Sequence, residues 1–392
     1  RYMPQHGRIR TLVIYFDNAA TSYPKPFQVP QAMDNFLRSR SANPGRGGHR
    51  MALEAGRVVL GVREQVSGLI YAGEPEEIIF TSSATEALNL ALIGGLRTGD
   101  HLVISSMEHN AVARTAYHLK GIGVEVGVVE ADRWGMITPE DVARAIKRNT
   151  RMVAAVHASN VTGGIMPIEE IGSLCRKAGI RFLVDASQTA GVIPVNVQQA
   201  QADLLAFPGH KGLYGPPGIG VLYVGSGIEL EPRKFGGTGS QSEDLEMPHL
   251  IPDRYEAGTL NTVGIAGLGA GIDFVQQTGM EKIAAHEREL TRHLMVEIKD
   301  ISRIKIYGPP NPEDRVGVVG FNIEGVDSTE VAFILDQVYG IAVRAGLHCA
   351  PLAHKTLGTL EKGLVRVSFS IFNTHKEVDQ LISALHEIVR EY

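Results

Sequence analysis

Three groups of side chains suited to binding one reactive ligand follow short apolar runs of the chain. Lys211 lies in a Gly- and Pro-rich stretch, Asp185 closes an apolar run, and residues 81–88 are small and hydroxylated. A lysine amine can form a covalent bond with an aldehyde, and a buried carboxylate can hold a cationic ring nitrogen. A helix start with free N–H groups and hydroxyls binds phosphate. Taken singly, each has a simpler explanation: a solvated lysine, a turn aspartate, and a helix cap at Ser83 or Thr85.

Two further polar residues follow apolar runs in the same way. His109 offers an imidazole face that can stack on a ring, and Asn160 offers a donor to a phenolic oxygen. Each could equally be a loop residue bonded to its own backbone. Because the carboxyl ends of parallel strands meet at one edge of a sheet, we expect all five groups to lie together. A ligand with a phosphate, a ring nitrogen and an aldehyde satisfies them, and pyridoxal 5′-phosphate (PLP) has these three parts.

The elements that must position these residues alternate along the first two thirds of the chain. Short β-branched apolar runs predict strands at 77–80, 101–105, 124–129, 152–157, 181–185, 203–207 and 220–224. Helical patterns predict helices at 85–94, 111–120, 139–148 and 167–178. This alternation is typical of β-α-β units. We therefore predict a large α/β domain over residues 15–262, with a mostly parallel sheet and helices on both faces.

A smaller α+β domain is predicted from residues 263–392 together with residues 1–14. Residues 263–299 are continuously helical in pattern, and a long helix there would carry the chain out of the first domain. Further strands are expected at 315–323, 341–344 and 363–371, with helices at 328–337 and 376–391. The second domain would then pack against the first.

The composition favours a protein that acts on a small molecule. The chain has 392 residues, 44% of them hydrophobic and 21% charged, and a formal net charge of −5. These values leave no electrostatic basis for binding nucleic acid or an anionic membrane. Two cysteines cannot build a disulfide framework or a four-cysteine zinc site, and we assign no metal ligands. With no signal-peptide pattern and no run of about 20 apolar residues, the cytoplasm is the expected location.

Ordered motifs along most of the chain resemble those of class V aminotransferase-fold enzymes, and among these the cysteine desulfurases. The resemblance runs from about residue 15 to the C-terminus and is closest to the group that includes selenocysteine lyases. The motifs are DNAAT at 17–21, SSATEA at 82–87, MEH at 107–109, VDASQ at 184–188, GHKG at 209–212, YEAGT at 255–259, RAGLHCA at 344–350 and RVSFSIFNT at 366–374.

The resemblance implies fold type I of the PLP-dependent transferases and a role for each cofactor residue. By similarity, Lys211 forms the Schiff base, Asp185 holds the pyridinium, and His109 stacks on the ring and serves as a proton donor. The remaining implied contacts are Asn160 and Gln188 to the phenolic oxygen, Ala84, Thr85 and His210 to the phosphate, and Thr259 to the phosphate of the neighbouring subunit. A homodimer is therefore implied.

The same resemblance assigns the substrate and its chemistry. Arg366 would bind the carboxylate of L-cysteine, and Arg344, Asn43 and His49 are assigned to substrate binding. L-Cysteine would be converted to L-alanine while its sulfur passes to Cys349 as a persulfide. A sulfur-acceptor protein is a further expected partner, and the sequence leaves open whether the sulfur serves iron–sulfur clusters, thiolated nucleosides or a cofactor.

The two cysteines are expected to differ. Cys349 lies beside His348 and near Arg344, in a stretch at 344–363 that we predict to be a loop, and neighbouring positive charge favours the reactive thiolate. Cys175 lies in a helical pattern and is expected to be a buried structural thiol.

Two positions depart from the family pattern, and they bear more on the substrate than on the cofactor. Pro208 stands where relatives usually have a hydroxyl residue that bonds the phosphate, and Leu347 stands where a second histidine is common. Selenocysteine lyase, or a C–S lyase that acts by β-elimination, is one alternative. A catalytically silent PLP-binding sulfur-carrier scaffold is another.

Overall fold

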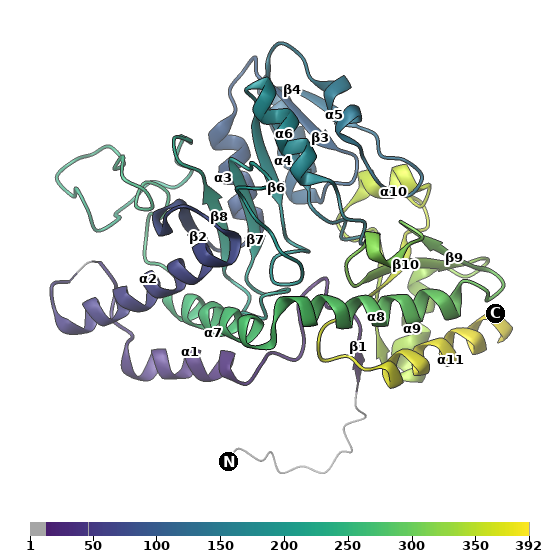
Figure 1. Ribbon diagram of the computed structural model, residues 1–392. Coiled ribbons are helices and arrows are strands. Elements are labelled where there is room, and N and C mark those ends of the chain that lie inside the picture. Colours follow the sequence, from purple (N-terminus) through teal and green to yellow (C-terminus); the bar gives the residue numbers. More distant parts are fainter. Residues whose placement is uncertain (1–12, 46, 392) are drawn as a thin grey trace.

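A seven-stranded sheet forms the centre of the larger part of the molecule (Figure 1). The computed structural model describes residues 13–45 and 47–391. In their order across the sheet, the strands are β2 (Ile78–Thr81), β8 (Gly220–Val224), β7 (Leu204–Pro208), β6 (Arg181–Asp185), β5 (Thr150–Val156), β3 (His101–Ser105) and β4 (Glu125–Val129). β8 runs antiparallel to both of its neighbours, and the remaining pairs are parallel. The predicted mostly parallel α/β sheet is therefore confirmed.

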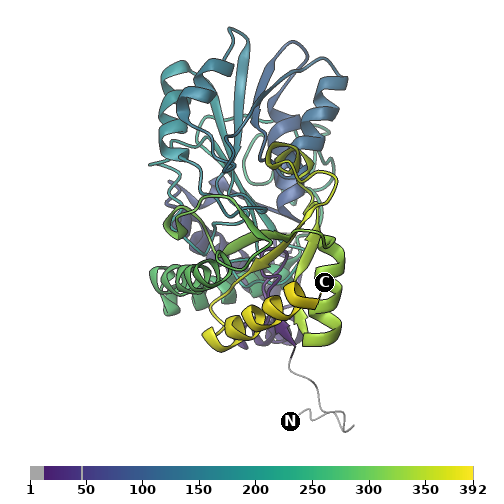
Figure 2. The ribbon, with the colours of Figure 1, turned by 90° about the vertical axis from the view of Figure 1, so that its right-hand side faces the viewer.

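Helices cover both faces of this sheet, which explains why its strands are apolar on both sides (Figure 2). One face packs against α3 (Ala84–Gly95) and α4 (Asn110–Gly121). The other packs against α2 (Arg50–Ile70), α5 (Pro139–Ala145), α6 (Ile168–Ala178) and α7 (Thr262–Thr278). Alternate strand residues fill the two layers, so burial fixes the register of each strand.

A second, antiparallel sheet lies beside the first. Its strands, in order, are β12 (Arg344–Gly346), β13 (Leu364–Ser368), β10 (Val318–Ile323) and β9 (Ile304–Tyr307). The helices that pack with it are α8 (Met280–Ile298), α9 (Ser328–Tyr339) and α11 (His375–Glu391). The elements outside these layers are β1 (Ile14–Tyr15), which pairs with β11 (Ile341–Ala342), the helices α1 (Gln28–Ser39) and α10 (Pro351–Leu357), and the 3₁₀ turns Pro75–Glu77 and Pro312–Asp314.

Two expectations about local structure were wrong. The predicted continuous helix at 263–299 is two helices, because Gly279 adopts a φ of 88° between α7 and α8. Glycine tolerates this conformation, whereas a residue with a Cβ atom would be strained. The predicted loop at 344–363 contains β12 and α10.

The predicted domain division stays a prediction. Residues 1–12 of the smaller domain lie outside the described residues. α7, which was assigned to that domain, lies against α1 and α2, whereas α8 lies against α11.

A buried ion pair joins α2 to the segment that precedes α7, and the backbone of β2 bonds to the same carboxylate. The guanidinium of Arg63 donates to Glu256 at 2.9 and 2.8 Å, and the amide of Phe80 donates to the same carboxylate at 2.6 Å. The side chains of Arg63 and Glu256 are almost fully buried, with 6% and 5% of their surface exposed. Removal of one partner would leave an uncompensated buried charge, so this pair holds the segment that carries Thr259 in place.

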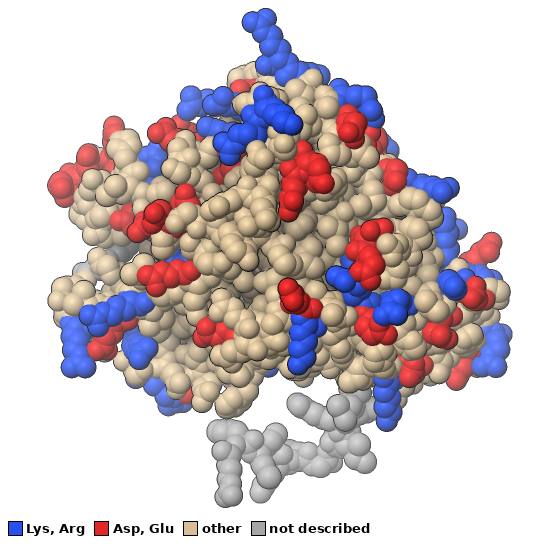
Figure 3. Space-filling view, viewed as in Figure 1, with Lys and Arg blue, Asp and Glu red and all other residues tan. Residues whose placement is uncertain are grey.

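Charges of both signs are interspersed on the face drawn in Figure 3, with wide uncharged areas between them. Within residues 13–45 and 47–391, no helix combines the length and the apolar character needed to cross a membrane.

Glu287 of α8 gives the fold a specific pH dependence. The carboxyl group is 5% exposed, and burial raises its pKa to about 8. Below the unfolded-state pKa of about 4.3 the folded and unfolded chains both hold this proton. Between about pH 4.3 and 8 only the folded chain holds it, so stability contributed by this group is lost as the pH rises.

We predict that Glu287→Gln flattens the fall in unfolding free energy between pH 5 and 8, with a gain at pH 8 on the order of a few kcal/mol. Denaturant unfolding at several pH values measures this effect. Glu297→Gln, an exposed position of the same helix, is the control and should leave the profile unchanged. Parallel profiles for wild type and Glu287→Gln would contradict the prediction.

Candidate functional site

The residues at one edge of the large sheet line a pocket of about 220 Å³. β2, β3, β5, β6 and β7 run in the same direction, so their carboxyl ends meet at this edge. The structure places ten of the predicted site residues in the lining: Ala84, Thr85, His109, Asn160, Asp185, Gln188, His210, Lys211, Arg344 and Arg366. The first eight come from the large-sheet region, and the last two come from strands of the second sheet.

Four predicted residues are absent from the pocket lining, and one of them is Cys349, although its neighbour His348 and its hydrogen-bond partner Arg344 are part of it. Asn43, His49 and Thr259 are exposed and absent from the lining. His49 instead caps α2, where its Nδ1 accepts from the amide of Ala52 at 3.3 Å. The assignment of Thr259 to a neighbouring subunit stays a prediction.

The start of α3 presents donors to one end of the pocket. Ser83 is the cap, and its hydroxyl accepts from the amide of Glu86 at 3.2 Å. The Thr85 hydroxyl and the N–H groups of Ala84 and Thr85 have no partner in the described part of the chain. A Cβ atom at Gly220 would lie 2.2 Å from the carbonyl carbon of Ser83, so only glycine allows β8 to approach this helix start. The arrangement is suited to an anion.

Lys211 lies in the loop that joins β7 to β8. Several donors converge on the carbonyl oxygen of the preceding residue, His210: the amide and hydroxyl of Ser22 at 3.0 and 3.2 Å, the hydroxyl of Thr21 at 3.0 Å and the ammonium of Lys25 at 2.8 Å. These contacts hold the peptide group that precedes the lysine.

The environment of Lys211 favours the neutral amine. Burial lowers its pKa to about 8, with Arg366 and Arg344 acting in the same direction and Asp185 opposing them. A neutral amine is the form that reacts with a carbonyl group and accepts a proton.

His109 and Asp185 have defined hydrogen-bonding states. The Nδ1 atom of His109 accepts from the amide of Ala111 at 3.0 Å, and burial lowers the pKa of the ring. The neutral ring therefore carries its proton on Nε2. The carboxylate of Asp185 accepts from the amide of Ser187 at 3.0 Å and from the Ser187 hydroxyl, and the side chain is 3% exposed. A buried carboxylate held in this way favours a cationic partner.

Two nitrogen atoms of the Arg366 guanidinium are hydrogen-bonded and the third has no partner among the described residues. Its Nη2 donates to Asp17 at 2.6 Å and its Nη1 donates to the carbonyl of Asn160 at 3.0 Å, while its buried Nε has no partner among the described residues. The guanidinium is 1% exposed at the pocket. A guanidinium with an unpaired N–H edge can bind a carboxylate.

Cys349 lies at the mouth of the pocket. Its thiol is exposed and accepts from Arg344 Nη2 at 3.7 Å, and its carbonyl accepts from the amide of Asn110 at 2.7 Å. Cys175 is fully buried, and burial raises its pKa to about 12. The predicted contrast between a buried and an accessible cysteine is confirmed.

Unpaired polar atoms mark where a ligand would bind. His210 Nδ1, Asn160 Oδ1 and Arg366 Nε are buried without a partner in the described part of the chain, and all three side chains line the pocket. Buried polar atoms in native proteins are normally hydrogen-bonded. Asn160 differs from the expectation in one respect, because its amide nitrogen donates to the carbonyl of His348 at 2.8 Å.

Sequence reasoning missed three residues that act on this site. Asp17 pairs with Arg366, Lys25 contacts the His210 carbonyl, and His348 lines the pocket. Asp17 was visible in the motif at 17–21, and His348 was adjacent to Cys349. Lys25 had no signal of its own, because its partner is a backbone atom 185 positions away.

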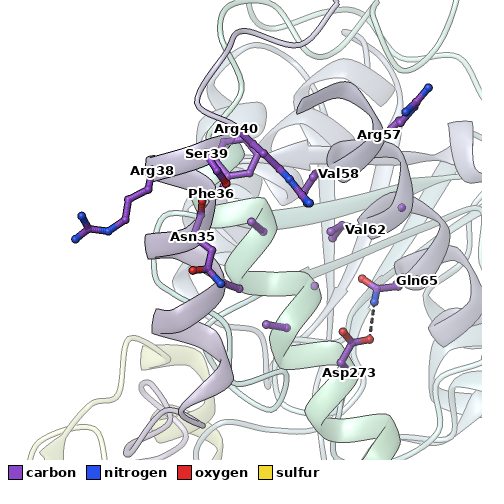
Figure 4. A pocket seen from close by; sticks show the side chains of 15 residues that line it. Asn35, Phe36, Arg38, Ser39, Arg40, Arg57, Val58, Val62, Gln65 and Asp273 are labelled. Atoms are coloured by element: carbon purple, nitrogen blue, oxygen red, sulfur yellow. Dashed lines mark hydrogen bonds between the residues drawn. The ribbon is translucent and has the colours of Figure 1, made fainter. Parts of the chain in front are cut away.

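A larger groove of about 640 Å³ lies elsewhere, between α1, α2 and α7 (Figure 4). Gln65 donates to Asp273 across it at 2.6 Å. The groove contains none of the predicted site residues. In residues 13–45 and 47–391, no group of three or more His, Cys, Asp or Glu is arranged to bind a metal ion.

Comparison with known proteins gives a consistent family. The aminotransferase class-V family model matches residues 14–381. A probable cysteine desulfurase of Methanothermobacter thermautotrophicus is 39% identical over 96% of this chain and 94% of its own length. A cysteine desulfurase of Haloferax volcanii is 35% identical, with coverage of 97% and 90%.

Solved structures agree with the sequence matches. The apo structure of a cysteine desulfurase from Thermococcus onnurineus has a TM-score of 0.91 and 36% identity, with 97% of this chain and 95% of that chain covered. The cysteine desulfurase CsdA of Escherichia coli, in its S-sulfonic acid form, has a TM-score of 0.85 and 29% identity, with coverage of 96% and 95%.

We predict that the amine of Lys211 titrates near pH 8 in the cofactor-free chain, because burial and two guanidinium groups destabilise its charged form. The rate of Lys211 carbamylation by cyanate, followed by mass spectrometry across pH 6–10, gives the midpoint. Arg366→Gln should raise the midpoint and Asp185→Asn should lower it, each by roughly half a pH unit. An exposed lysine, Lys282, serves as the internal reference. Midpoints that do not move in opposite directions would show that these charges do not act on the amine.

Proposed function

The chain belongs to the class V aminotransferase family, and from this premise we propose that it is a PLP-dependent cysteine desulfurase. The reaction converts L-cysteine to L-alanine and transfers the sulfur to Cys349 as a persulfide. One observation supports this most directly: an exposed thiol beside a guanidinium stands at the mouth of a pocket that also holds Lys211, Asp185 and Arg366. A pocket for transamination alone would not need this thiol.

The residues of the pocket fit PLP. The free N–H groups and hydroxyl at the start of α3 suit its phosphate, together with the unpaired Nδ1 of His210. Asp185 suits the ring nitrogen, and the Lys211 amine suits the aldehyde. When bound, the cofactor supplies an electron sink for the carbanion that forms at the substrate Cα. Pro208 has no N–H or hydroxyl to offer, so we propose that His210 and the start of α3 supply the phosphate contacts.

Three residues orient the substrate and move its protons. Arg366 binds the carboxylate of L-cysteine through its free N–H groups, while Asp17 and Asn160 keep the guanidinium in place. The neutral amine of Lys211 accepts the Cα proton. His109 has Nε2–H available as a proton donor, because its Nδ1 is engaged by the backbone.

Cys349 completes the reaction as the nucleophile. Its thiolate attacks the substrate sulfur, a new S–S bond forms, and the C–S bond breaks with its electron pair left on carbon. Protonation of that carbon gives alanine. Arg344 Nη2 lies 3.7 Å from the sulfur and donates to it, which keeps the thiol beside a guanidinium.

The assembly and the cellular context are also part of the proposal. We propose a homodimer in which Thr259 of one chain reaches the phosphate site of the other, and a sulfur-acceptor protein that takes the persulfide sulfur from the exposed Cys349. Asn43 and His49 would then line the substrate entrance across the subunit boundary. A reducing compartment such as the cytoplasm would keep this thiol free.

We predict that Cys349→Ala lowers the rate of alanine formation from L-cysteine at least about 100-fold, because the sulfur loses its acceptor. Alanine and pyruvate are quantified by chromatography, with L-selenocysteine assayed in parallel. Cys175→Ala is the matched control and should keep most of the activity, since that thiol is buried away from the pocket.

Undiminished alanine formation by Cys349→Ala would contradict the persulfide step. Pyruvate as the main product would instead identify a C–S lyase, and activity on selenocysteine alone would identify a selenocysteine lyase.

We predict that the purified protein, supplied with PLP, absorbs near 400–430 nm and that Lys211→Ala loses this band with its covalent linkage. The catalytic rate should fall about 1000-fold or more, since the residue is both the cofactor anchor and the base. Lys25→Met is an informative comparison, because it removes a nearby amine that is not aimed into the pocket. A wild-type protein that takes up no PLP would contradict the cofactor assignment.

A further inference from the structure

A second histidine, His354, lies behind the residue that precedes the reactive cysteine. The rings of His348 and His354 are stacked with an interplanar angle of 14° and centroids 5.6 Å apart. His354 is fully buried and His348 is 2% exposed. His354 lies on α10, directly after the Cys349 turn, and does not line the pocket.

The hydrogen bonds of the two rings form a chain with one direction. His348 Nε2 lies 3.3 Å from the carbonyl oxygen of Arg344, so Nε2 must carry a proton and donate it. In the neutral ring, Nδ1 is then an acceptor, and His354 Nε2 donates to it at 3.4 Å. His354 Nδ1 is left to accept from the Thr359 hydroxyl at 2.8 Å, which is a shorter contact than the 3.5 Å from the same hydroxyl to the carbonyl oxygen of His354.

The opposite direction fails on the same geometry. If His354 Nδ1 donated to Thr359, His348 Nδ1 would have to donate to His354, and His348 Nε2 would face the Arg344 carbonyl as a second acceptor. Only a cationic His348 could avoid this, and burial beside Arg366 and Arg344 lowers its pKa to about 2. This series of hydrogen bonds also ends on the carbonyl oxygen of Arg344, so it cannot relay a proton. It can only hold the two rings in position.

The position that it holds is strained. His348 and Cys349 are consecutive residues with φ values of 50° and 56°, in the left-handed region that residues with a Cβ atom rarely adopt. Such a pair persists only where its surroundings over-determine it. Asn160 holds the His348 carbonyl at 2.8 Å, Asn110 holds the Cys349 carbonyl at 2.7 Å, and His354 holds the His348 ring.

We propose that His354 is a positioning residue for the sulfur-transfer step. By donating to His348 it keeps the His348–Cys349 pair left-handed and therefore keeps the Cys349 sulfur beside Arg344. The inference rests on the proposed function, because it assigns a consequence for the sulfur that Cys349 accepts. His354 is not bonded to Lys211, Asp185 or Arg366 and reaches the pocket only through His348, so we expect its loss to affect the sulfur-transfer step more than the binding of cofactor or substrate.

Two substitutions at this position separate the donor from the bulk of the ring. His354→Gln keeps an N–H at the place of Nε2, whereas His354→Asn can reproduce only the Nδ1 side. We expect His354→Asn to lower kcat for alanine formation about tenfold with KM for L-cysteine within twofold of wild type, and His354→Gln to restore most of the rate. Thr359→Val, which removes the group that orients His354, should show a smaller loss of the same kind.

The rate of Cys349 alkylation by iodoacetamide gives a readout that does not depend on turnover. It should fall about fivefold in His354→Asn, because the sulfur is no longer held beside Arg344. Arg344→Gln should cause a similar fall, and the double variant should be no slower than Arg344→Gln alone. Additive losses would show that His354 does not act through this contact.

Three results would overturn the proposal: unchanged alkylation and kcat in His354→Asn, a matching loss of PLP absorbance or of substrate affinity, and equal defects in the Asn and Gln variants. If His354→Asn does not fold, Thr359→Val decides by the same measurements. Failure of wild-type protein to form alanine would refute the proposed function, whereas the alkylation cycle would still test the position of the thiol.

Discussion

The segment from Asp17 to Lys25 is the constraint on which the site depends, because it bonds to both sheets at once. Asp17 pairs with Arg366 on β13, and the hydroxyl of Ser368 accepts from the amide of Ala19. On the other side, Gln188 donates to the carbonyl of Ala19, and Lys25 donates to the carbonyl before Lys211. Arg366, the proposed ligand of the substrate carboxylate, and Lys211, the proposed base, are thus both held by one short stretch of backbone. A displacement of either sheet would therefore shift both Arg366 and Lys211.

The electrostatics of the pocket follow from this arrangement. Lys211, Arg344 and Arg366 face Asp185 and Asp17, so cationic groups outnumber anionic groups in this set of side chains. Burial lowers the pKa of Lys211 and of Arg366, and for the lysine it produces a neutral amine near pH 8. A phosphate and a carboxylate would supply the missing negative charge. The same surplus explains why the histidines at this site stay neutral, since burial and the neighbouring cations lower the pKa of His210 to about 4.

Sequence reasoning identified the parts of the fold whose signals are local. The seven strands of the large sheet were expected because each is a short apolar run, and residues placed after strands 78–81, 181–185 and 204–208 do meet in one pocket. The antiparallel direction of β8 and the break at Gly279 depend on tertiary packing, which periodicity does not report. Helices α1 and α2 were not predicted either.

Long-range pairs were beyond the reach of sequence patterns for the same reason. Asp17 and Arg366 are 349 positions apart, and only the folded chain shows that the carboxylate anchors the guanidinium. The hydrogen-bonded chain through His354 likewise could not be found from residue spacing, because it depends on where the two histidine rings lie. Motif resemblance identified the residues that we propose contact the ligand, whereas the residues that hold them are seen only in the folded chain.

The antiparallel β8 has a further consequence for how the site can vary. In a parallel pair, a crossover of a dozen or more residues, usually with a helix, would separate β7 from β8. Here Pro208 pairs directly with Gly220, so the loop that bears Lys211 begins and ends at one pair of neighbouring residues in the sheet. One added residue would change the entropy of closing this loop very little. It would, however, move Lys211 relative to the residues that follow the four other strands at the pocket. We therefore expect this loop to tolerate a change of length poorly, and its glycines limit its composition as well, because a Cβ atom at Gly212 would lie 2.5 Å from the carbonyl oxygen of Ala190.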